Sequence, residues 1–238
     1  MIKYSALCQR NFIGTTLRAL VYFTLFRSCC TRNSFSDIDL STQTLNPSVT
    51  EFMITGNAAS DYFGRSVSTA GDIDNDGYDD TIVGAYQKNS VQGAVYAIYG
   101  AEESSFFDLD LSTTTLDPLT TGFMITGDAA NDHIGFLVST VGDINNDGSG
   151  DIIIGAYGEN SYQGAAYVIY GGAKASMSNI VLGSTTLDPL TTGFMITGNA
   201  VGDCFGVSAA KPGISIKTDM MTSLLEPEER VVIEEQSL

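Results

Sequence analysis

Hydrophobic residues along this chain occur in short runs separated by polar turns, which predicts β-strands rather than helices. Within one stretch we expect four strands, because the runs are rich in β-branched and aromatic residues; they cover residues 66–70, 80–86, 93–100 and 122–126. The runs TIVGAY and AVYAIY are apolar at successive positions instead of at every second position. Strands of that kind are buried on both faces, so we expect a sheet packed between two neighbours.

The same pattern returns along the chain with a period of 71 residues. The segment FMITG begins at Phe52, Phe123 and Phe194, and DIDLS at residue 37 returns as DLDLS at residue 108. Four short antiparallel strands per unit, with the units stacked face to face, are typical of β-propeller blades. The sequence therefore predicts an all-β protein built of propeller blades. A β-sandwich, whose strands would alternate between inside and outside positions, is the alternative.

Three regions follow from the repeat. Residues 37–210 hold about two complete units and the start of a third. Residues 1–36 carry five basic groups, no acid and a short apolar run at 19–26, which fits a signal peptide, a transit peptide or a misassigned gene start. The run is too short to cross a membrane. Residues 211–238 have no counterpart in the units and are interpreted as an unrelated tail, either a short acidic helix or solvated chain.

Each complete unit contains an acidic loop between its first two predicted strands. A glycine at place 6 permits the positive φ of a loop that wraps an ion, and the carbonyl at place 7, from Tyr78 or Ser149, can then turn inward. Calcium takes six to eight oxygen ligands at about 2.3–2.6 Å and would cancel the repulsion between the crowded carboxylates. Places 1, 3, 5 and 9 offer Asp72, Asp74, Asp76 and Asp80 in the first loop, and Asp143, Asn145, Asp147 and Asp151 in the second.

Other interpretations of the acidic loops make different demands on the sequence. An EF-hand needs a bidentate Glu at place 12 and flanking helices, whereas place 12 is Val83 or Ile154 within a predicted strand. The same residues argue against a dockerin-type loop. A plain Asn-Asp-Gly turn without a metal is the remaining alternative. The occurrence of the whole ligand pattern twice, at the same phase of the repeat, favours calcium.

Charge and composition exclude several classes of function. The net charge is −17, and residues 37–210 hold 22 acidic against three basic residues, so a nucleic acid would be repelled. Four cysteines give neither a disulfide framework nor a zinc spacing. The single histidine, His133, falls in a slot that holds Tyr62 one unit earlier and Cys204 one unit later, which indicates a structural role. We therefore expect no catalytic site.

The ordered motifs resemble the FG-GAP repeats that form the propeller head of integrin α subunits and also occur in glycosylphosphatidylinositol-specific phospholipase D and secreted adhesins. The resemblance implies a seven-bladed propeller and assigns the calcium ligands to the loop residues named above, with Tyr78 and Ser149 giving carbonyls. In the second unit Ile134 replaces the phenylalanine. The Phe-Gly element is matched by Phe63-Gly64 and Phe205-Gly206. The Gly-Ala-Pro element, with Tyr in place of Pro, is matched by Gly84-Ala85-Tyr86 and Gly155-Ala156-Tyr157.

From these observations we expect a calcium-binding, non-catalytic recognition or adhesion module, secreted or extracellular. The resemblance implies that it would bind a protein or glycan ligand through loops 87–92 and 158–163, opposite the acidic loops. The alternatives are the non-catalytic propeller part of a secreted hydrolase, and a structural blade donor in a larger assembly. Because a closed propeller needs at least about four blades, we expect missing blades or other chains to complete the ring, with a truncated gene model as the favoured explanation.

Overall fold

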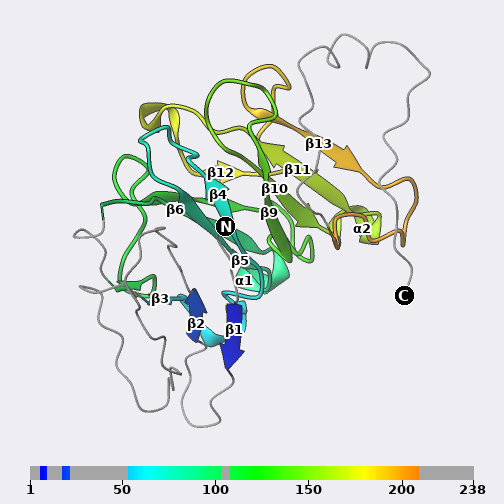
Figure 1. Ribbon diagram of the computed structural model, residues 1–238. Helices are drawn as coiled ribbons and strands as arrows, with labels where there is room; N and C mark the ends of the chain where they lie inside the picture. Colours follow the sequence, from blue (N-terminus) through cyan, green and yellow to red (C-terminus); the bar gives the residue numbers. More distant parts are fainter. Residues whose placement is uncertain (1–5, 10–17, 22–52, 103–107, 209–238) are drawn as a thin grey trace, which may run out of the picture.

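The computed structural model describes residues 6–9, 18–21, 53–102 and 108–208. In this part of the chain, short strands form three small sheets that follow one another in chain order (Figure 1). Among the described residues, helical structure is limited to single turns between the strands. They are η1 (Ala59–Asp61), α1 (Lys88–Val91), α2 (Glu159–Tyr162) and η3 (Lys174–Ser176).

The central sheet contains the four strands expected from one unit. Its strand order is β12-β8-β6-β5-β4, and the pairs β4–β5, β5–β6 and β6–β8 are antiparallel. The register places Val67 opposite Val83 and Val83 opposite Tyr96, so alternate residues of neighbouring strands face the same side. The strands are β4 (Val67–Gly71), β5 (Asp80–Ala85), β6 (Ala94–Ile98), β8 (Gly122–Thr126) and β12 (Ile180–Val181).

The second sheet repeats this arrangement one unit later. Its order is β13-β11-β10-β9, again with antiparallel neighbours. Its innermost strand β9 packs beside β4, and the backbone N–H of Val138 donates to Ser66 Oγ at 2.9 Å across the two blades. The strands are β9 (Leu137–Gly142), β10 (Asp151–Ala156), β11 (Ala165–Ile169) and β13 (Gly193–Thr197).

A third, partial sheet precedes these two. It has the order β1-β2-β3-β7 and consists of β1 (Ala6–Gln9), β2 (Arg18–Val21), β3 (Ile54–Thr55) and β7 (Leu109–Asp110). Two antiparallel pairs are followed by one parallel pair, the same sequence of pairings as β5-β6-β8-β12. No strand was predicted at β1 or β2. The leader interpretations of residues 1–36 stay predictions.

The partial sheet and the central sheet each receive an outer strand from the following unit, which the sequence pattern did not predict. Strand β7 pairs in parallel with β3, and β12 pairs in parallel with β8. Strand β7 lies within residues 101–121 of one unit, and β12 lies at the matching place of the next. These outer strands fasten the partial sheet and the central blade to the unit that follows each of them.

In the described part of the chain the core consists of two clusters, one at each junction between neighbouring sheets. Side chains of β5 contribute to both, because Ile82 packs toward the second blade and Val83 toward the partial sheet. Every residue of β5 and of β6 is buried, which confirms that these strands are covered on both faces. Phe63 is 1% exposed and contacts Tyr96 edge to face with ring centroids 5.4 Å apart.

The segment FMIT occurs in both β8 and β13, and its exposure differs with the presence of a neighbouring blade. In β8 the side chain of Ile125 is fully buried against the second blade, whereas Ile196 at the same place in β13 is 36% exposed. Among the described residues, no further sheet lies against β13. The difference therefore comes from the neighbour and not from the sequence.

The structure confirms the all-β fold class and the four antiparallel strands of each propeller blade. It corresponds to two complete blades and a partial one. The predicted boundaries of the repeat region at residues 37 and 210 lie outside the described residues. The tail at 211–238 also lies outside them.

Candidate metal centre

The first acidic loop joins β4 to β5 at one end of the central sheet. The strands pair until Gly71 faces Asp80, with a β-bulge between Thr69 and Gly71 that releases the chain into the loop. Gly77 has φ +94°, and no atom lies within 4 Å of the position that a Cβ would take there. A glycine at this place provides the left-handed turn that the loop needs, as predicted.

Two aspartates hold the first loop in shape through backbone hydrogen bonds. Asp72 accepts hydrogen bonds from the N–H groups of Asp76 and Gly77 at 2.9 and 2.8 Å. Asp80, at the base of the loop, accepts from Ile73 at 2.7 Å and from Gly100 at 2.6 Å. The loop is therefore preorganised by its own carboxylates, each of which keeps further lone pairs for a ligand.

The carboxylates of Asp72, Asp74 and Asp80 converge, with one oxygen from each within 4.8 Å of the others. Both oxygens of Asp74 are buried without a hydrogen bond, although the ammonium of Lys174 forms an ion pair at 2.7 Å with Oδ2. A buried carboxylate without hydrogen bonds is unfavourable unless a cation compensates its charge. The residues present thus fit a hard divalent cation, which prefers such oxygen ligands.

The second loop repeats the hydrogen bonding of the first. Asp143 accepts from the N–H groups of Asp147 and Gly148, both at 3.0 Å. Asp151 accepts from Ile144 at 2.7 Å and from Gly171 at 2.9 Å. The two loops are thus one design used twice, which a chance Asn-Asp-Gly turn would not require.

The two loops nevertheless differ at place 3. The first has Asp74, which is 2% exposed, whereas the second has the half-buried Asn145, whose amide donates to Asp147 Oδ2 at 2.8 Å. The predicted carbonyl ligands also differ in setting, since Tyr78 is 44% exposed and Ser149 is 2% exposed. Their role as ligands stays a prediction.

Burial shifts the ionisation of the carboxylates at the base of both loops. It raises the pKa of Asp80 to about 7, against the lowering effect of its two backbone hydrogen bonds, and Asp74 and Asp76 raise it further. It also raises the pKa of Asp151 to about 6, with Asp147 adding to the shift. Burial likewise raises the pKa of Asp74, opposed by Lys174. A bound cation would favour the charged forms and act against these shifts.

Protein held in a calcium chelator is expected to become more heat-stable as the pH falls from about 8 to about 5.5. Asp80 and Asp151 have folded pKa values of about 7 and about 6, above the ordinary value of 3.8. In this window the folded state binds more protons than the unfolded chain, so stability decreases as pH rises. Melting temperatures by circular dichroism at constant ionic strength would measure the trend.

The matched control for this trend is the double variant Asp80→Asn, Asp151→Asn, which is expected to flatten it. A melting temperature that increases with pH between about 5.5 and about 7 in chelator would contradict the expectation.

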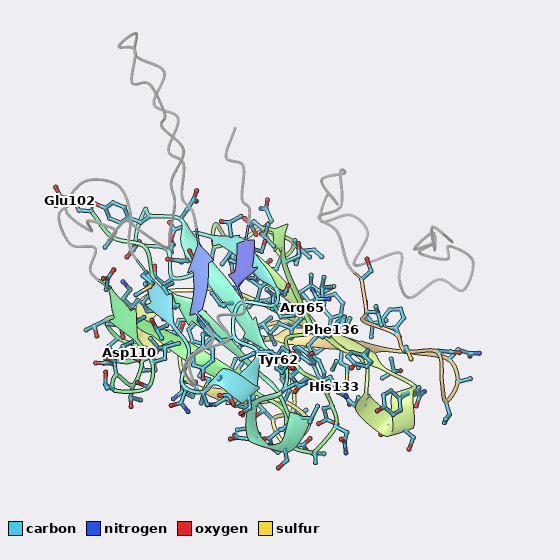
Figure 2. The ribbon with its side chains drawn as sticks, turned by 90° about the horizontal axis from the view of Figure 1, so that it is seen from below. Tyr62, Arg65, Glu102, Asp110, His133 and Phe136 are labelled. Carbon is cyan, nitrogen blue, oxygen red and sulfur yellow. The ribbon has the colours of Figure 1, made fainter. Side chains whose placement is uncertain are left out.

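A second group of side chains gathers at the end of the sheets opposite the acidic loops. Strand β4 starts after Arg65 and β5 ends before Tyr86, so these residues lie at the far end of the hairpin from the loop. Figure 2 shows Tyr62, Arg65, His133 and Phe136 together in one region. We call the following residues the aromatic cluster: Tyr62, Tyr86, His133, Phe136, Tyr157 and Tyr162.

His133 is a packed member of this cluster. Its ring stacks on Tyr157 with centroids 4.3 Å apart, and Nδ1 lies 3.1 Å from the Tyr157 hydroxyl. The side chain is 8% exposed, and burial lowers its pKa. The structure agrees with the structural role predicted for it.

The loops predicted to bind a ligand lie next to the aromatic cluster. Both form the same unusual turn, in which Asn89, Ser90 and Val91 have positive φ and so do the three residues 160–162. Such a conformation is strained for a β-branched residue, and strain of this kind concentrates at functional sites. A pocket beside the loop at residues 158–163 is lined by residues 128–132, residues 158–162 and Gly183.

Repeated four-stranded sheets, each with a carboxylate loop between its first two strands, define a propeller-type repeat protein. The FG-GAP repeat family matches residues 63–98 and 137–169. The first match runs from Phe63 to the end of β6, and the second runs from the start of β9 to the end of β11. The chain therefore carries FG-GAP repeats, as the motifs predicted.

The chain is also similar to integrin α subunits. It is 31% identical to integrin alpha-PS2 of Drosophila melanogaster over 163 residues, which are 62% of this chain and 11% of that protein. It is 35% identical over 96 residues to integrin alpha pat-2 of Caenorhabditis elegans (40% and 7%), and 28% identical over 155 residues to integrin alpha-8 of Gallus gallus (60% and 14%). The chain thus spans only a small fraction of these relatives. In the part of the chain that the structure describes, no helix is both long and apolar enough for a membrane span.

Proposed function

We propose that this chain is a calcium-binding, non-catalytic recognition module of the extracellular adhesion type. The observation that carries the proposal is the duplicated loop, in which matching carboxylates are held by matching backbone hydrogen bonds at equivalent places of two blades. The similarity to integrin α subunits supports an adhesion role.

The chemistry of the donors supports calcium as the ion. All side-chain groups at places 1, 3, 5 and 9 offer oxygen, and among the described residues neither histidine nor cysteine lies at these places. Asp72, Asp74, Asp76 and Asp80 would hold the ion in the first loop, and Asp143, Asn145, Asp147 and Asp151 in the second. When bound, the ion supplies positive charge to a hairpin whose carboxylates otherwise repel one another. Calcium accepts a larger and less regular set of oxygens than magnesium, which suits loops that offer four side-chain groups and a backbone carbonyl.

The aromatic cluster and the strained turns beside it support a recognition surface at the opposite end. Tyr162 is 44% exposed there, and Arg65 lies over the ring of Phe136 at 5.2 Å from its centroid. Tyrosine and arginine are enriched where proteins bind partners. A protein or glycan that contacts residues 87–92 and 158–163 would meet this surface, whereas the net charge of −17 opposes a nucleic acid.

The described residues also support a non-catalytic role. Side chains with raised pKa values lie in or beside the acidic loops, among packed tyrosines, and at Asp132 and Glu159 in the pocket lining. His133 is stacked on Tyr157 and hydrogen-bonded to it. A catalytic site would require a nucleophile and a base within reach of each other and of a substrate.

Calcium titration tests the proposal directly. Isothermal titration of the chelator-treated chain is expected to show two binding events, and saturating calcium is expected to raise the melting temperature. An ion present at about a thousand times its dissociation constant adds about 4 kcal/mol of stability per site. Magnesium at the same concentration is the control and is expected to stabilise less. Folded protein that takes up no calcium at millimolar concentration would overturn the proposal.

A further inference from the structure

The first acidic loop has a partner that neither the repeat pattern nor the ligand spacing indicates. Lys174, in the turn η3 after β11, lies 98 residues further along the chain. Its Nζ is 2.7 Å from Asp74 Oδ2 and 2.8 Å from Asp76 Oδ2. The ammonium therefore contacts the carboxylates at places 3 and 5 of the loop.

Backbone hydrogen bonds between the first acidic loop and the segment that follows β11 hold Lys174 in this position. The N–H of Lys174 donates to Asp74 O at 3.0 Å, and the N–H of Gly172 donates to Ile73 O at 2.9 Å. A third bond, from Gly150 N–H to Asp72 O at 2.7 Å, comes from the second loop. Because these bonds join the second blade to the first loop, the Lys174 side chain starts beside the carboxylates. It therefore loses little conformational entropy when its ammonium contacts them.

The ammonium also has the surroundings of a bound cation. It lies 4.7 Å from the ring centroid of Tyr99, which adds a cation–π contact to the two ion pairs. The side chain of Asp74 is fully buried, whereas that of Lys174 is 30% exposed. The lysine can thus compensate a buried charge and still withdraw its ammonium into solvent.

The second loop lacks such a counter-ion. Among the described residues, no lysine or arginine forms an ion pair with it, and Asn145 replaces the buried aspartate at place 3. The first loop has four carboxylates at its ligand places and one ammonium, a sum of −3, and the second has three carboxylates and no ammonium, also −3. The lysine therefore occurs at the loop with one more carboxylate.

We propose that Lys174 is a tethered counter-ion of the first acidic loop, and that calcium must displace its ammonium from Asp74 and Asp76 to bind there. The inference depends on the proposed function, since it assigns the order of events at the same site. An ammonium and a calcium ion held together on Asp74 and Asp76 would repel each other at such short distance, so the two cations compete for these carboxylates. The first loop is thus a calcium site whose empty form is stabilised by its own chain.

The test compares Lys174→Met with Lys88→Met in the full chain, each combined with Asp143→Ala so that only the first loop takes up calcium. Lys88 is a matched control, because it also pairs with an aspartate, Asp61 at 3.6 Å, and lies over a tyrosine ring, Tyr96 at 5.9 Å, but at the other end of the sheet. The parent for both is the chain with Asp143→Ala alone. Relative to this parent, Lys174→Met is expected to increase the calcium association constant of the first loop roughly tenfold, and Lys88→Met is expected to leave it within about twofold.

Melting temperatures separate this role from simple packing. In chelator Lys174→Met is expected to lower the melting temperature, because Asp74 loses its counter-ion, whereas in saturating calcium it is expected to equal or exceed the parent. Lys174→Arg, which keeps the charge, is expected to behave as the parent in both assays. If Lys174→Met does not fold in chelator, Lys174→Gln takes its place in the calcium titration and in the melting experiments.

The results distinguish the two hypotheses. Equal first-loop affinity in the parent, Lys174→Met and Lys88→Met, or a lower affinity in Lys174→Met, would overturn the counter-ion role while leaving calcium binding intact. An equal loss of melting temperature in calcium and in chelator would also overturn it. If the parent and every lysine variant bind no calcium, the proposed function itself fails.

Discussion

Replacing Asp80 with alanine is expected to lower the melting temperature in calcium by about 10 °C and to change it little in chelator. In calcium the variant loses a ligand at the base of the loop. In chelator two effects oppose each other: the variant loses hydrogen bonds from Ile73 and Gly100, but it also removes a buried carboxylate whose pKa is raised to about 7. Thermal unfolding followed by circular dichroism in both conditions measures the difference.

The neighbouring Asp79 provides the matched control. It is exposed, it stands at place 8 of the loop, and Asp79→Ala removes the same charge without removing a predicted ligand. We expect this variant to keep most of the calcium effect. Similar losses for Asp80→Ala in calcium and in chelator would argue against ligation, and Asp151→Ala should reproduce the result at the second loop.

Gly84→Ala is expected to destabilise the chain by at least about 3 kcal/mol, whether or not calcium is present. A Cβ at residue 84 would lie 2.0 Å from the carbonyl oxygen of Gly135 and 3.0 Å from its carbon. Both atoms belong to the backbone of the next blade, so no side-chain rotation can relieve the clash. Urea denaturation in calcium and in chelator would measure the loss of unfolding free energy.

Gly172→Ala is the appropriate control for this substitution. Its Cβ would approach only side-chain atoms, the nearest at 3.4 Å, so we expect a much smaller change. Gly155→Ala should behave like Gly84→Ala, because its Cβ would lie 1.9 Å from the carbonyl oxygen of Gly206. A loss below about 1 kcal/mol at residue 84 would show that the two blades are not packed as described.

These glycine contacts give the FG-GAP motif a physical basis. The glycine of Phe-Gly in one unit lies against the glycine of Gly-Ala in the unit before it, at Gly84 with Gly135 and at Gly155 with Gly206. The hydrophobic residue before it fills the adjacent core, as Phe63 does at 1% exposure and Ile134 also does at 1% exposure. The replacement of phenylalanine by isoleucine in the second unit therefore preserves its burial.

Much of the fold was predictable from the sequence because the strands carry strong local signals. The antiparallel strands β4, β5, β6 and β8 were expected within one or two residues at each end, since apolar runs and turns define them. The parallel outer strands β7 and β12 were missed. Each has two residues within a polar segment, and its pairing depends on a neighbouring unit and not on its own composition.

The same distinction applies to the candidate sites. Ligand spacing within nine residues indicated both acidic loops, and the structure brings Asp72, Asp74 and Asp80 together. Lys174 gave no such signal, because it reaches Asp76 from 98 residues away. The aromatic cluster was also missed, since its members come from different units; only their recurrence at a spacing of 71 residues, as in Tyr86 and Tyr157, could have indicated it.

The parallel outer strands have a consequence for how such chains change in length. Strand β3 takes its partner from 55 residues further on, and β8 does the same, so these two units are fastened to their successors in an identical manner. Adding or deleting one whole period therefore recreates this fastening and the glycine contact at the new junction. A gain or loss of half a period would leave one blade without its fastening. We therefore expect tandem duplication of this architecture to proceed in whole periods.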